Sequence, residues 1–301
     1  MHELSRLLAD LPLGGLRYYE RIGSTNEAAS EWAAQGAPNL ALVIADEQTA
    51  GRGRSGRRWF TSPGAGLAFS VILRPEFILE ENTEAETASQ NSLPATSKGK
   101  FRRSYTQPPA PSIQSILRLT ALGALAVSDA LRDHYQLATH IKWPNDILVD
   151  GRKLAGVLVE AQWQGEELLS AVLGIGINVA SSSVPNAEDL LFPATCVEAV
   201  LGQPVERWDL LHAVIQALVS WYPRLNSPDF LQSWEQQLAY RGEWVRISAQ
   251  QEVSGTDGLE SHTEGVLSGL NQDGFLRLKT SSGEIILVQF GEVHLRPMTP
   301  A

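Results

Sequence analysis

Apolar positions in the first part of the chain predict three strands and one helix. Short apolar runs bounded by turn residues, which are typical of strands, occur at Leu16–Ile22, Leu40–Ala45 and Leu67–Leu73. After the first run, Ser24-Thr-Asn-Glu27 has the spacing of a capping box and precedes alanines and a tryptophan at helical spacing. We therefore expect a helix from about Thr25 to Gln35.

The pattern then changes to a polar segment and back. Glu, Thr, Ser, Gln and Pro dominate residues 78–112, and such a composition buries too little apolar surface to offset the entropy of ordering. We predict a disordered insertion there. Helical spacing follows from Ile113 to about Tyr135. A meander of strands is expected next, at His140–Trp143, Ile147–Val149, Leu154–Ala161 and Leu168–Val179.

The remainder separates into helices and then short strands. The pattern predicts helices at roughly Thr195–Leu201, Glu206–Leu225 and Pro228–Leu238. After Tyr240, short strands alternate with Gly- and Asn-containing turns, as in a small β-barrel. The prediction is an α+β protein. Residues 1–240 form a mixed β-sheet with helices packed on it, and residues 241–301 form the barrel.

Composition narrows the class of protein. The 301 residues are 43% hydrophobic, enough for one large or two ordinary domains with real cores. Cys196 is the single cysteine, and no signal segment or long apolar run is present, so we expect a cytoplasmic protein without membrane contact. A formal net charge of −10 argues against general nucleic-acid binding. The histidines show no metal-ligand spacing, so we expect no structural metal.

One loop is strongly basic, in contrast to the acidic composition of the whole chain. The segment Gly51-Arg-Gly-Arg-Ser-Gly-Arg-Arg-Trp59, here called the Gly/Arg loop, combines backbone freedom with guanidinium groups that bind phosphate or carboxylate. Its glycines match a dinucleotide fingerprint, but Pro63 and Gly64 break the helix that this fingerprint needs. A P-loop is excluded because Arg57-Arg58 stand where Lys and Ser/Thr should be. The loop is suited to closing over a small anion.

Four segments follow one another along the chain. They are Ser24-Thr-Asn26, Glu47-Gln-Thr-Ala-Gly-Arg-Gly-Arg-Ser-Gly-Arg-Arg-Trp59, Lys142-Trp-Pro-Asn-Asp146 with Gly151-Arg-Lys-Leu-Ala-Gly156, and Gly174-Ile-Gly-Ile-Asn178. In this order they resemble the biotin–protein ligase (biotin–[acetyl-CoA-carboxylase] ligase) family, and the resemblance covers Leu16 to Arg296 apart from the insertion. It implies the class II synthetase-like catalytic domain of biotin–lipoate ligases and an SH3-like C-terminal barrel.

The resemblance also implies a reaction and its residues. Biotin would be activated by ATP with Mg²⁺ to biotinyl-5′-AMP and passed to a lysine of biotin carboxyl carrier protein, a subunit of acetyl-CoA carboxylase. The implied biotin contacts are Ser24, Thr25, Asn26, Gln48, Arg52, Gly53, Arg54, Lys153, Gly156 and Gly176. The implied ATP and adenylate contacts are Arg54, Arg57, Trp59, Lys142, Asn145, Asn178 and Arg296. The implied catalytic residues are Arg54, Lys142, Lys153 and Asp146.

Residue chemistry agrees with these implied roles. The ureido edge of biotin both donates and accepts hydrogen bonds, which calls for short neutral polar groups such as those of Ser24-Thr-Asn26 and Gln48. Joining an acid to ATP gathers three negative groups, so catalysis depends on positioning and charge neutralisation. Asp146 would either orient magnesium or help to deprotonate the acceptor amine. The residues of a metal site stay unassigned.

Two other functions are compatible with the sequence. Lipoate or octanoate ligases and transferases share this catalytic architecture, but they need a pocket for a linear chain. A non-enzymatic binding module, whose barrel recruits a partner, is the other. Since only about fifteen residues precede the ligase-like core, we expect no helix-turn-helix domain and no repressor role. The oligomeric state is left open, with a homodimer as one possibility.

Overall fold

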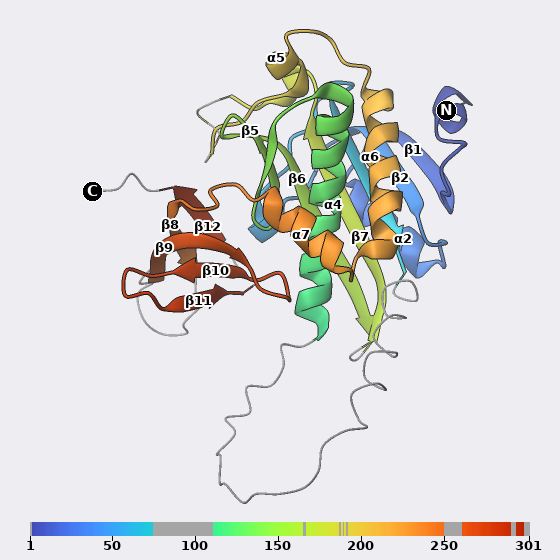
Figure 1. Ribbon diagram of the computed structural model, residues 1–301. Coiled ribbons are helices and arrows are strands. Elements are labelled where there is room, and N and C mark those ends of the chain that lie inside the picture. Colours follow the sequence, from blue (N-terminus) through green and yellow to red (C-terminus); the bar gives the residue numbers. More distant parts are fainter. Residues whose placement is uncertain are drawn as a thin grey trace, which may run out of the picture.

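The structure is a computed structural model that describes residues 2–74, 111–164, 167–186, 188, 190, 192–249, 261–289 and 293–297. A seven-stranded mixed sheet with helices packed on it forms the larger part, and a five-stranded sheet lies at the C-terminal end (Figure 1). This arrangement confirms the predicted α+β class.

The large sheet has the strand order β1-β2-β3-β7-β6-β5-β4. Strands β1 and β2 pair in parallel, whereas the remaining neighbours pair antiparallel. The strands are β1 (Gly15–Ile22), β2 (Ala41–Gln48), β3 (Gly66–Leu73), β4 (Thr139–Lys142), β5 (Asp146–Val149), β6 (Arg152–Gln164) and β7 (Glu167–Asn178). In the β5–β6 turn, Asp150 and Gly151 both have positive φ (50° and 69°), as the predicted Asp-Gly hairpin requires.

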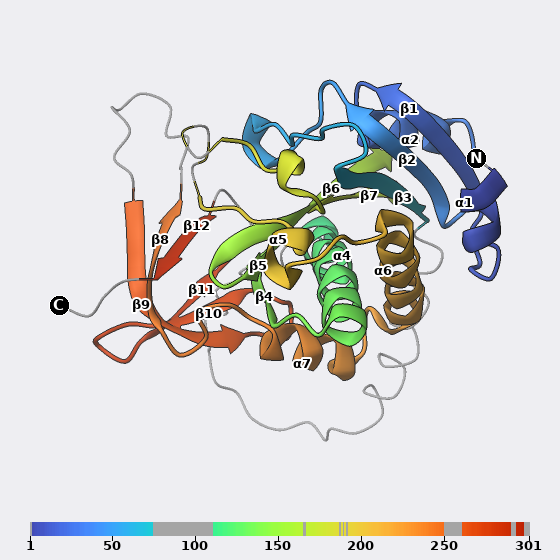
Figure 2. The ribbon, with the colours of Figure 1, turned by 90° about the horizontal axis from the view of Figure 1, so that it is seen from above.

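Helices cover the two faces of this sheet unequally. Long helices α4 (Pro111–Tyr135) and α6 (Arg207–Trp221) lie side by side on one face (Figure 2), where they pack in one core with Leu42, Ile44 and Phe69. The ten-residue helix α2 (Thr25–Ala34) covers the other face against β2, β3 and β7. Because side chains alternate along strands, Ser70, Gly174 and Gly176 are on the α2 face. Because α2 is short, it leaves part of this face of the sheet uncovered, where a binding site can form.

The five-stranded sheet packs directly on the α4 side of the molecule. Its order is β11-β10-β9-β8-β12, and its buried residues belong to the same core cluster as α4 and α6. The turn between β9 and β10 is anchored by Trp143 Nε1, which donates to Gly274 O at 3.1 Å, and by Glu235 Oε2, which accepts from Leu270 N at 2.8 Å. The strands are β8 (Trp244–Ala249), β9 (Ser261–Leu270), β10 (Leu276–Lys279), β11 (Ile285–Val288) and β12 (Val293–Pro297).

Most predicted elements are confirmed within a few residues, and the differences have local causes. The helix predicted to reach Leu225 ends at Trp221 and continues as a 3₁₀ turn through Pro223, a residue that has no backbone N–H to donate. Helices α5 (Val197–Leu201) and α7 (Pro228–Gln236) match their predictions, whereas α1 (His2–Leu7) and β12 were not predicted.

The predicted insertion lies almost wholly outside the described residues. Residues 75–110 are not described, and α4 already begins at Pro111, so residues 111 and 112 belong to a helix rather than to the insertion. Within the described ranges, no helix is both long enough and apolar enough to cross a membrane.

Candidate active site

One hollow on the α2 face gathers the predicted site residues. Its walls come from the N-terminus of α2, the end of β2, the Gly/Arg loop, the β4–β5 turn, and the middle of β6 and β7. Apart from Asn178 and Arg296, every residue implied above lines this hollow: Ser24, Thr25, Asn26, Gln48, Arg52, Gly53, Arg54, Arg57, Trp59, Lys142, Asn145, Asp146, Lys153, Gly156 and Gly176. Residues as far apart in sequence as Ser24 and Gly176 therefore meet at one place.

The helix start places short polar groups at one end of the hollow. Ser24 is the N-cap residue of α2, with extended backbone angles, but its side chain makes no capping hydrogen bond. The capping role predicted for Ser24-Thr-Asn-Glu27 is therefore not observed, although the predicted helix start is correct. Ser24, Thr25 and Asn26 are each at most 4% exposed and point their side chains into the protein rather than to solvent. Their short polar side chains therefore form part of the wall of the hollow.

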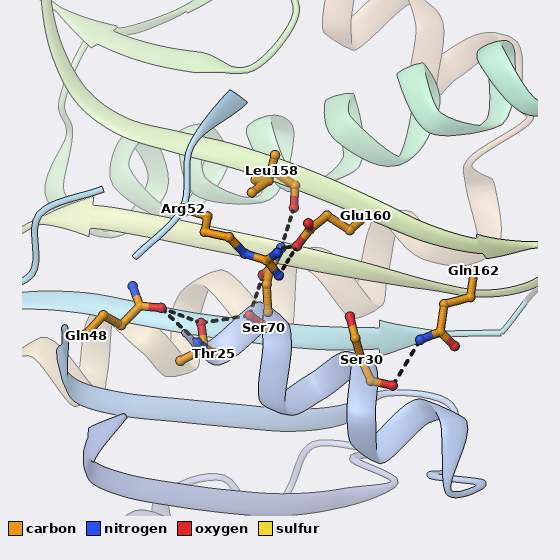
Figure 3. A network of polar contacts seen from close by, with 9 residues as sticks. Thr25, Ser30, Gln48, Arg52, Ser70, Leu158, Glu160 and Gln162 are labelled. Atoms are coloured by element: carbon orange, nitrogen blue, oxygen red, sulfur yellow. Dashed lines mark hydrogen bonds and ion pairs between the residues drawn. The ribbon is translucent and has the colours of Figure 1, made fainter. Parts of the chain in front are cut away.

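Four side chains, Thr25, Asn26, Gln48 and Ser70, form what we call the acceptor cluster (Figure 3). Thr25 Oγ1 lies 3.1 Å from Gln48 Oε1 and 2.9 Å from Ser70 Oγ, and Ser70 Oγ lies 2.7 Å from Asn26 Oδ1. Three oxygen–oxygen contacts share only the two hydroxyl protons of Thr25 and Ser70, since amide oxygens bring none. The cluster is short of donors and is suited to accept N–H groups from a ligand.

Glycines flatten the middle of the hollow. Gly156 on β6 pairs with Gly176 on β7, and we call this pair the glycine floor. The Trp59 ring lies on it: a Cβ built on Gly176 would be only 2.3 Å from Trp59 Cε2, and one built on Gly156 would be 3.3 Å from Cζ3. Glycine inside a strand allows this close approach of a flat group. The floor is therefore a surface for a ring.

Basic side chains gather at the other end of the hollow. Lys153 Nζ lies 2.6 Å from Asp146 Oδ1 and 5.6 Å from the Trp59 ring centroid. Arg54 Nη1 donates to Asn145 Oδ1 at 3.1 Å. We call Arg54, Arg57, Lys142 and Lys153 the cationic end; among the described lining residues, Asp146 is the one acid that faces them. Such an excess of positive charge attracts anionic groups.

The Gly/Arg loop is a compact ribbon rather than an open coil. Arg52 and Arg58 form an isolated antiparallel bridge, Gly53 N donates to Arg57 O at 2.7 Å, and Trp59 N donates to Gly51 O at 2.9 Å. A 3₁₀ turn at Arg54–Gly56 closes the tip, where Gly56 has φ 70°. No helix follows the loop, which agrees with the rejection of a dinucleotide fingerprint.

Two predicted residues lie elsewhere. Asn178 is 5% exposed, and its Nδ2 donates to Thr195 O at 3.0 Å, so it braces the chain that follows β7. Arg296 belongs to β12, where it pairs in register with Arg246, and its side chain is outside the described part of the structure. Their contacts with a nucleotide stay predictions.

The structure adds three residues that sequence reasoning missed. Ser70 is fully buried in the otherwise apolar strand β3, and a lone hydroxyl there was a usable signal. Glu160 binds both Asn26 and Arg52, and Phe192 lies under Lys142 with the ammonium 3.9 Å from its ring centroid. No local pattern marks Glu160 or Phe192, because their partners are distant in sequence.

Fold and hollow together define a protein with hydrogen-bond acceptors at one end of a single hollow and an excess of positive charge at the other. The chain belongs to the Biotin/lipoate A/B protein ligase family, whose sequence profile it matches over residues 18–94 and 100–178.

Individual relatives agree with this assignment. The chain is 31% identical over 271 residues to the biotin–[acetyl-CoA-carboxylase] ligase of Paracoccus denitrificans, covering 89% of this chain and 95% of that protein. It is 29% identical over 271 residues to the bifunctional ligase/repressor BirA of Bacillus subtilis, covering 89% of this chain and 70% of that protein. The solved structure of biotin protein ligase from Aquifex aeolicus in complex with biotin and ATP superposes with a TM-score of 0.69 at 26% identity, covering 94% and 99% of the two chains.

Proposed function

We infer that this protein is a biotin–protein ligase that activates biotin with ATP and transfers it to a lysine of biotin carboxyl carrier protein. The observation that carries this inference is the hollow itself, which joins a donor-poor acceptor cluster to a cationic end across a glycine floor. Family membership and relatives named as biotin–[acetyl-CoA-carboxylase] ligases support the same activity.

In the bound state, the two ends of the hollow would hold the two ends of biotin. The ureido N–H groups donate to the acceptor cluster, and the bicyclic ring lies on the glycine floor, from which Trp59 moves toward the nucleotide side. The acid tail then reaches Lys153, which exchanges its contact with Asp146 for the biotin carboxylate. Buried polar groups left unpaired by a wrong ligand give such a pocket its selectivity.

Activation then requires charge neutralisation more than covalent chemistry. A biotin carboxylate oxygen attacks the α-phosphorus of ATP, the bond to the pyrophosphate oxygen breaks, and biotinyl-5′-AMP forms. All four cations line the hollow: Arg54 and Lys153 would hold the new acyl phosphate, Lys142 the α-phosphate, and Arg57 would face the phosphates. Preorganised cations aimed at developing charge supply such stabilisation.

The residues present fit a magnesium ion that arrives with the nucleotide. Mg²⁺ in such sites takes one or two carboxylates and completes its shell with phosphate oxygens and water. Asp146, with Asn145 beside it, would hold the ion, which neutralises phosphate charge when bound. Among the described residues, no group of three or more His, Cys, Asp or Glu side chains is placed to bind a metal by protein ligands alone.

Transfer completes the reaction. The amine of the acceptor lysine attacks the acyl carbon, the bond to the phosphate oxygen breaks, and AMP leaves. Asp146 is the carboxylate nearest to Lys153 in the hollow, so in this second half-reaction, apart from its role toward the ion during activation, we assign it to accept the proton that the amine loses. A single cysteine favours a reducing compartment, so we place the reaction in the cytoplasm.

Replacement of Lys153 tests the assignment of the reacting centre. Lys153→Ala removes the ammonium from the cationic end, and we expect biotinyl-5′-AMP formation to fall by roughly 10²–10³-fold, as for loss of one preorganised charge. Lys279→Ala, which removes an exposed lysine on β10 outside the hollow, serves as the matched control and should leave the rate unchanged. Equal rates for the two variants would refute the assignment.

A lipoate or octanoate ligase is the second candidate, because the family includes such enzymes. Lipoate and octanoate have no N–H donors, so neither satisfies the acceptor cluster. We therefore expect excess lipoate to leave the binding of labelled biotin unchanged. Displacement of biotin by lipoate at similar concentration would favour the second candidate.

A further inference from the structure

Glu160 lies just outside the hollow and joins three parts of the site. Its Oε2 accepts from Asn26 Nδ2 at 2.7 Å and from Arg52 Nη2 at 2.9 Å (Figure 3). One carboxylate oxygen on β6 therefore connects the start of α2 with the Gly/Arg loop. Glu160 is absent from the lining of the hollow, and it lines a second, more open depression on the other side of the loop. Its carboxylate therefore acts on the hollow through Asn26 and Arg52 rather than as part of its wall.

The carboxylate, at 2.7 Å, and the more distant Leu158 carbonyl, at 3.5 Å, both accept from Asn26 Nδ2, and the carboxylate is the closer and charged of these two acceptors. An ionised carboxylate only accepts hydrogen bonds, so it selects the amide orientation in which the NH₂ group faces it. Asn26 Oδ1 is then turned toward Ser70 Oγ, 2.7 Å away. Because that oxygen is an acceptor, the proton of Ser70 is drawn to it and is not available to a ligand. Glu160 thus favours, as the stronger of two acceptors for the Asn26 NH₂ group, the shortage of donors in the acceptor cluster.

The same carboxylate binds one of two neighbouring arginines of the loop, so that the two point in different directions. Arg52 and Arg54 are two residues apart, yet Arg52 is turned to Glu160 while Arg54 donates to Asn145 at the cationic end. The Arg52 side chain is 44% exposed, and the carboxylate of Glu160 is what pairs with it at 2.9 Å. Pairing with Glu160 holds the ribbon across the hollow and leaves Arg54 directed at the reacting groups.

We propose that Glu160 is a positioning residue that makes one end of the hollow an acceptor of N–H groups and holds the Gly/Arg loop over it. This inference rests on the proposed function. It predicts that selection of the ureido ring depends on a side chain that the ring never touches, through Asn26 on one side and Arg52 on the other.

The test compares three variants in biotin-dependent ATP–pyrophosphate exchange. Glu160→Gln keeps the size of the side chain, but it removes the charge and allows the Asn26 amide to turn. We expect the KM for biotin to rise about tenfold or more, as for loss of a charge-assisted hydrogen bond. The KM for ATP and kcat should change less than twofold, since Lys142, Lys153 and Arg54 are untouched.

Gln162→Ala is the matched control. Gln162 lies two residues further along β6 and also ties this strand to α2, through Nε2 to Ser30 O at 3.0 Å, but it touches neither the loop nor the acceptor cluster (Figure 3). Its KM for biotin should stay within twofold of the wild-type value. Arg52→Gln, which removes an exposed side chain, should raise the KM less than Glu160→Gln does, because Asn26 keeps its orientation.

Trypsin cleavage provides a readout that does not depend on activity. In the free protein, cleavage within the Gly/Arg loop should be faster for Glu160→Gln and Arg52→Gln than for Gln162→Ala. A wild-type KM in Glu160→Gln, or equal increases in Glu160→Gln and Gln162→Ala, would overturn the proposal while the proposed function stands. Absence of biotin-dependent exchange in the wild-type protein would instead overturn the proposed function.

Discussion

Adding one methyl group to the glycine floor should weaken the binding of biotin without a matching loss of folding stability. In Gly176→Ala, the new Cβ would lie 2.3 Å from Trp59 Cε2, whereas ordinary contacts begin at 3.4 Å. The ring, or any ligand ring in its place, must therefore retreat by about 1 Å. Overpacking of this size costs about 1–3 kcal/mol, which corresponds to roughly a 5- to 150-fold weaker dissociation constant for biotin.

The fold should tolerate the same change. Gly176 is not among the glycines with positive φ, and alanine in a strand is favoured over glycine by about 0.5–1 kcal/mol. Because the half-buried Trp59 ring must also shift, we expect this gain and the repacking cost to offset each other, so that the unfolding free energy, measured by urea titration, stays within about 1 kcal/mol of the wild-type value. Calorimetric titration with biotin measures the dissociation constant, which is the second quantity in the prediction. Gly23→Ala is the control, because its added Cβ meets only Glu27 Oε2 at 3.7 Å. A biotin dissociation constant within twofold of wild type in Gly176→Ala would refute the glycine floor.

Two further predictions concern the scaffold. The Tyr18 hydroxyl donates to Asp46, which raises the pKa of Tyr18 to about 12. This contribution to stability is therefore complete below pH 10 and is lost as pH rises toward 12. Tyr18→Phe should abolish one high-pH tyrosinate absorbance step and flatten the loss of unfolding free energy in that window; an unchanged titration would contradict this. Glu235→Ala leaves Leu270 N–H without its partner and removes an ion pair with Arg241, so the unfolding free energy should fall by about 1–3 kcal/mol. A change below about 0.5 kcal/mol, the ordinary effect of a surface substitution, would exclude Glu235 as an anchor of the C-terminal sheet.

Elements with strong local signals were predictable from the sequence. The apolar run of β3 and the Asp150-Gly151 turn carry their structure in neighbouring residues. Helix α4 was found from its apolar spacing, although its first residues were assigned to the insertion. The sequence pattern identified where α2 begins. The capping hydrogen bond that it predicted is not present, because the side chain of Ser24 does not cap the helix.

Only those site residues that belong to local sequence motifs were predictable. Residues in the Gly/Arg loop and the Lys142–Asp146 segment were found because they stand together in sequence. Glu160 was missed because its partners, Asn26 and Arg52, are 134 and 108 residues away. Ser70 was missed because a strand buried on both faces gives no sign of which face a residue occupies. The pairing of Arg52 with Glu160 was missed for the same reason.

The most direct test of the account is the exchange of labelled pyrophosphate into ATP by the wild-type protein, with biotin or lipoate as the acid. A hollow short of donors at one end and cationic at the other predicts rapid exchange with biotin and none above background with lipoate. Exchange that proceeds equally with lipoate, or that requires neither acid, would contradict the account.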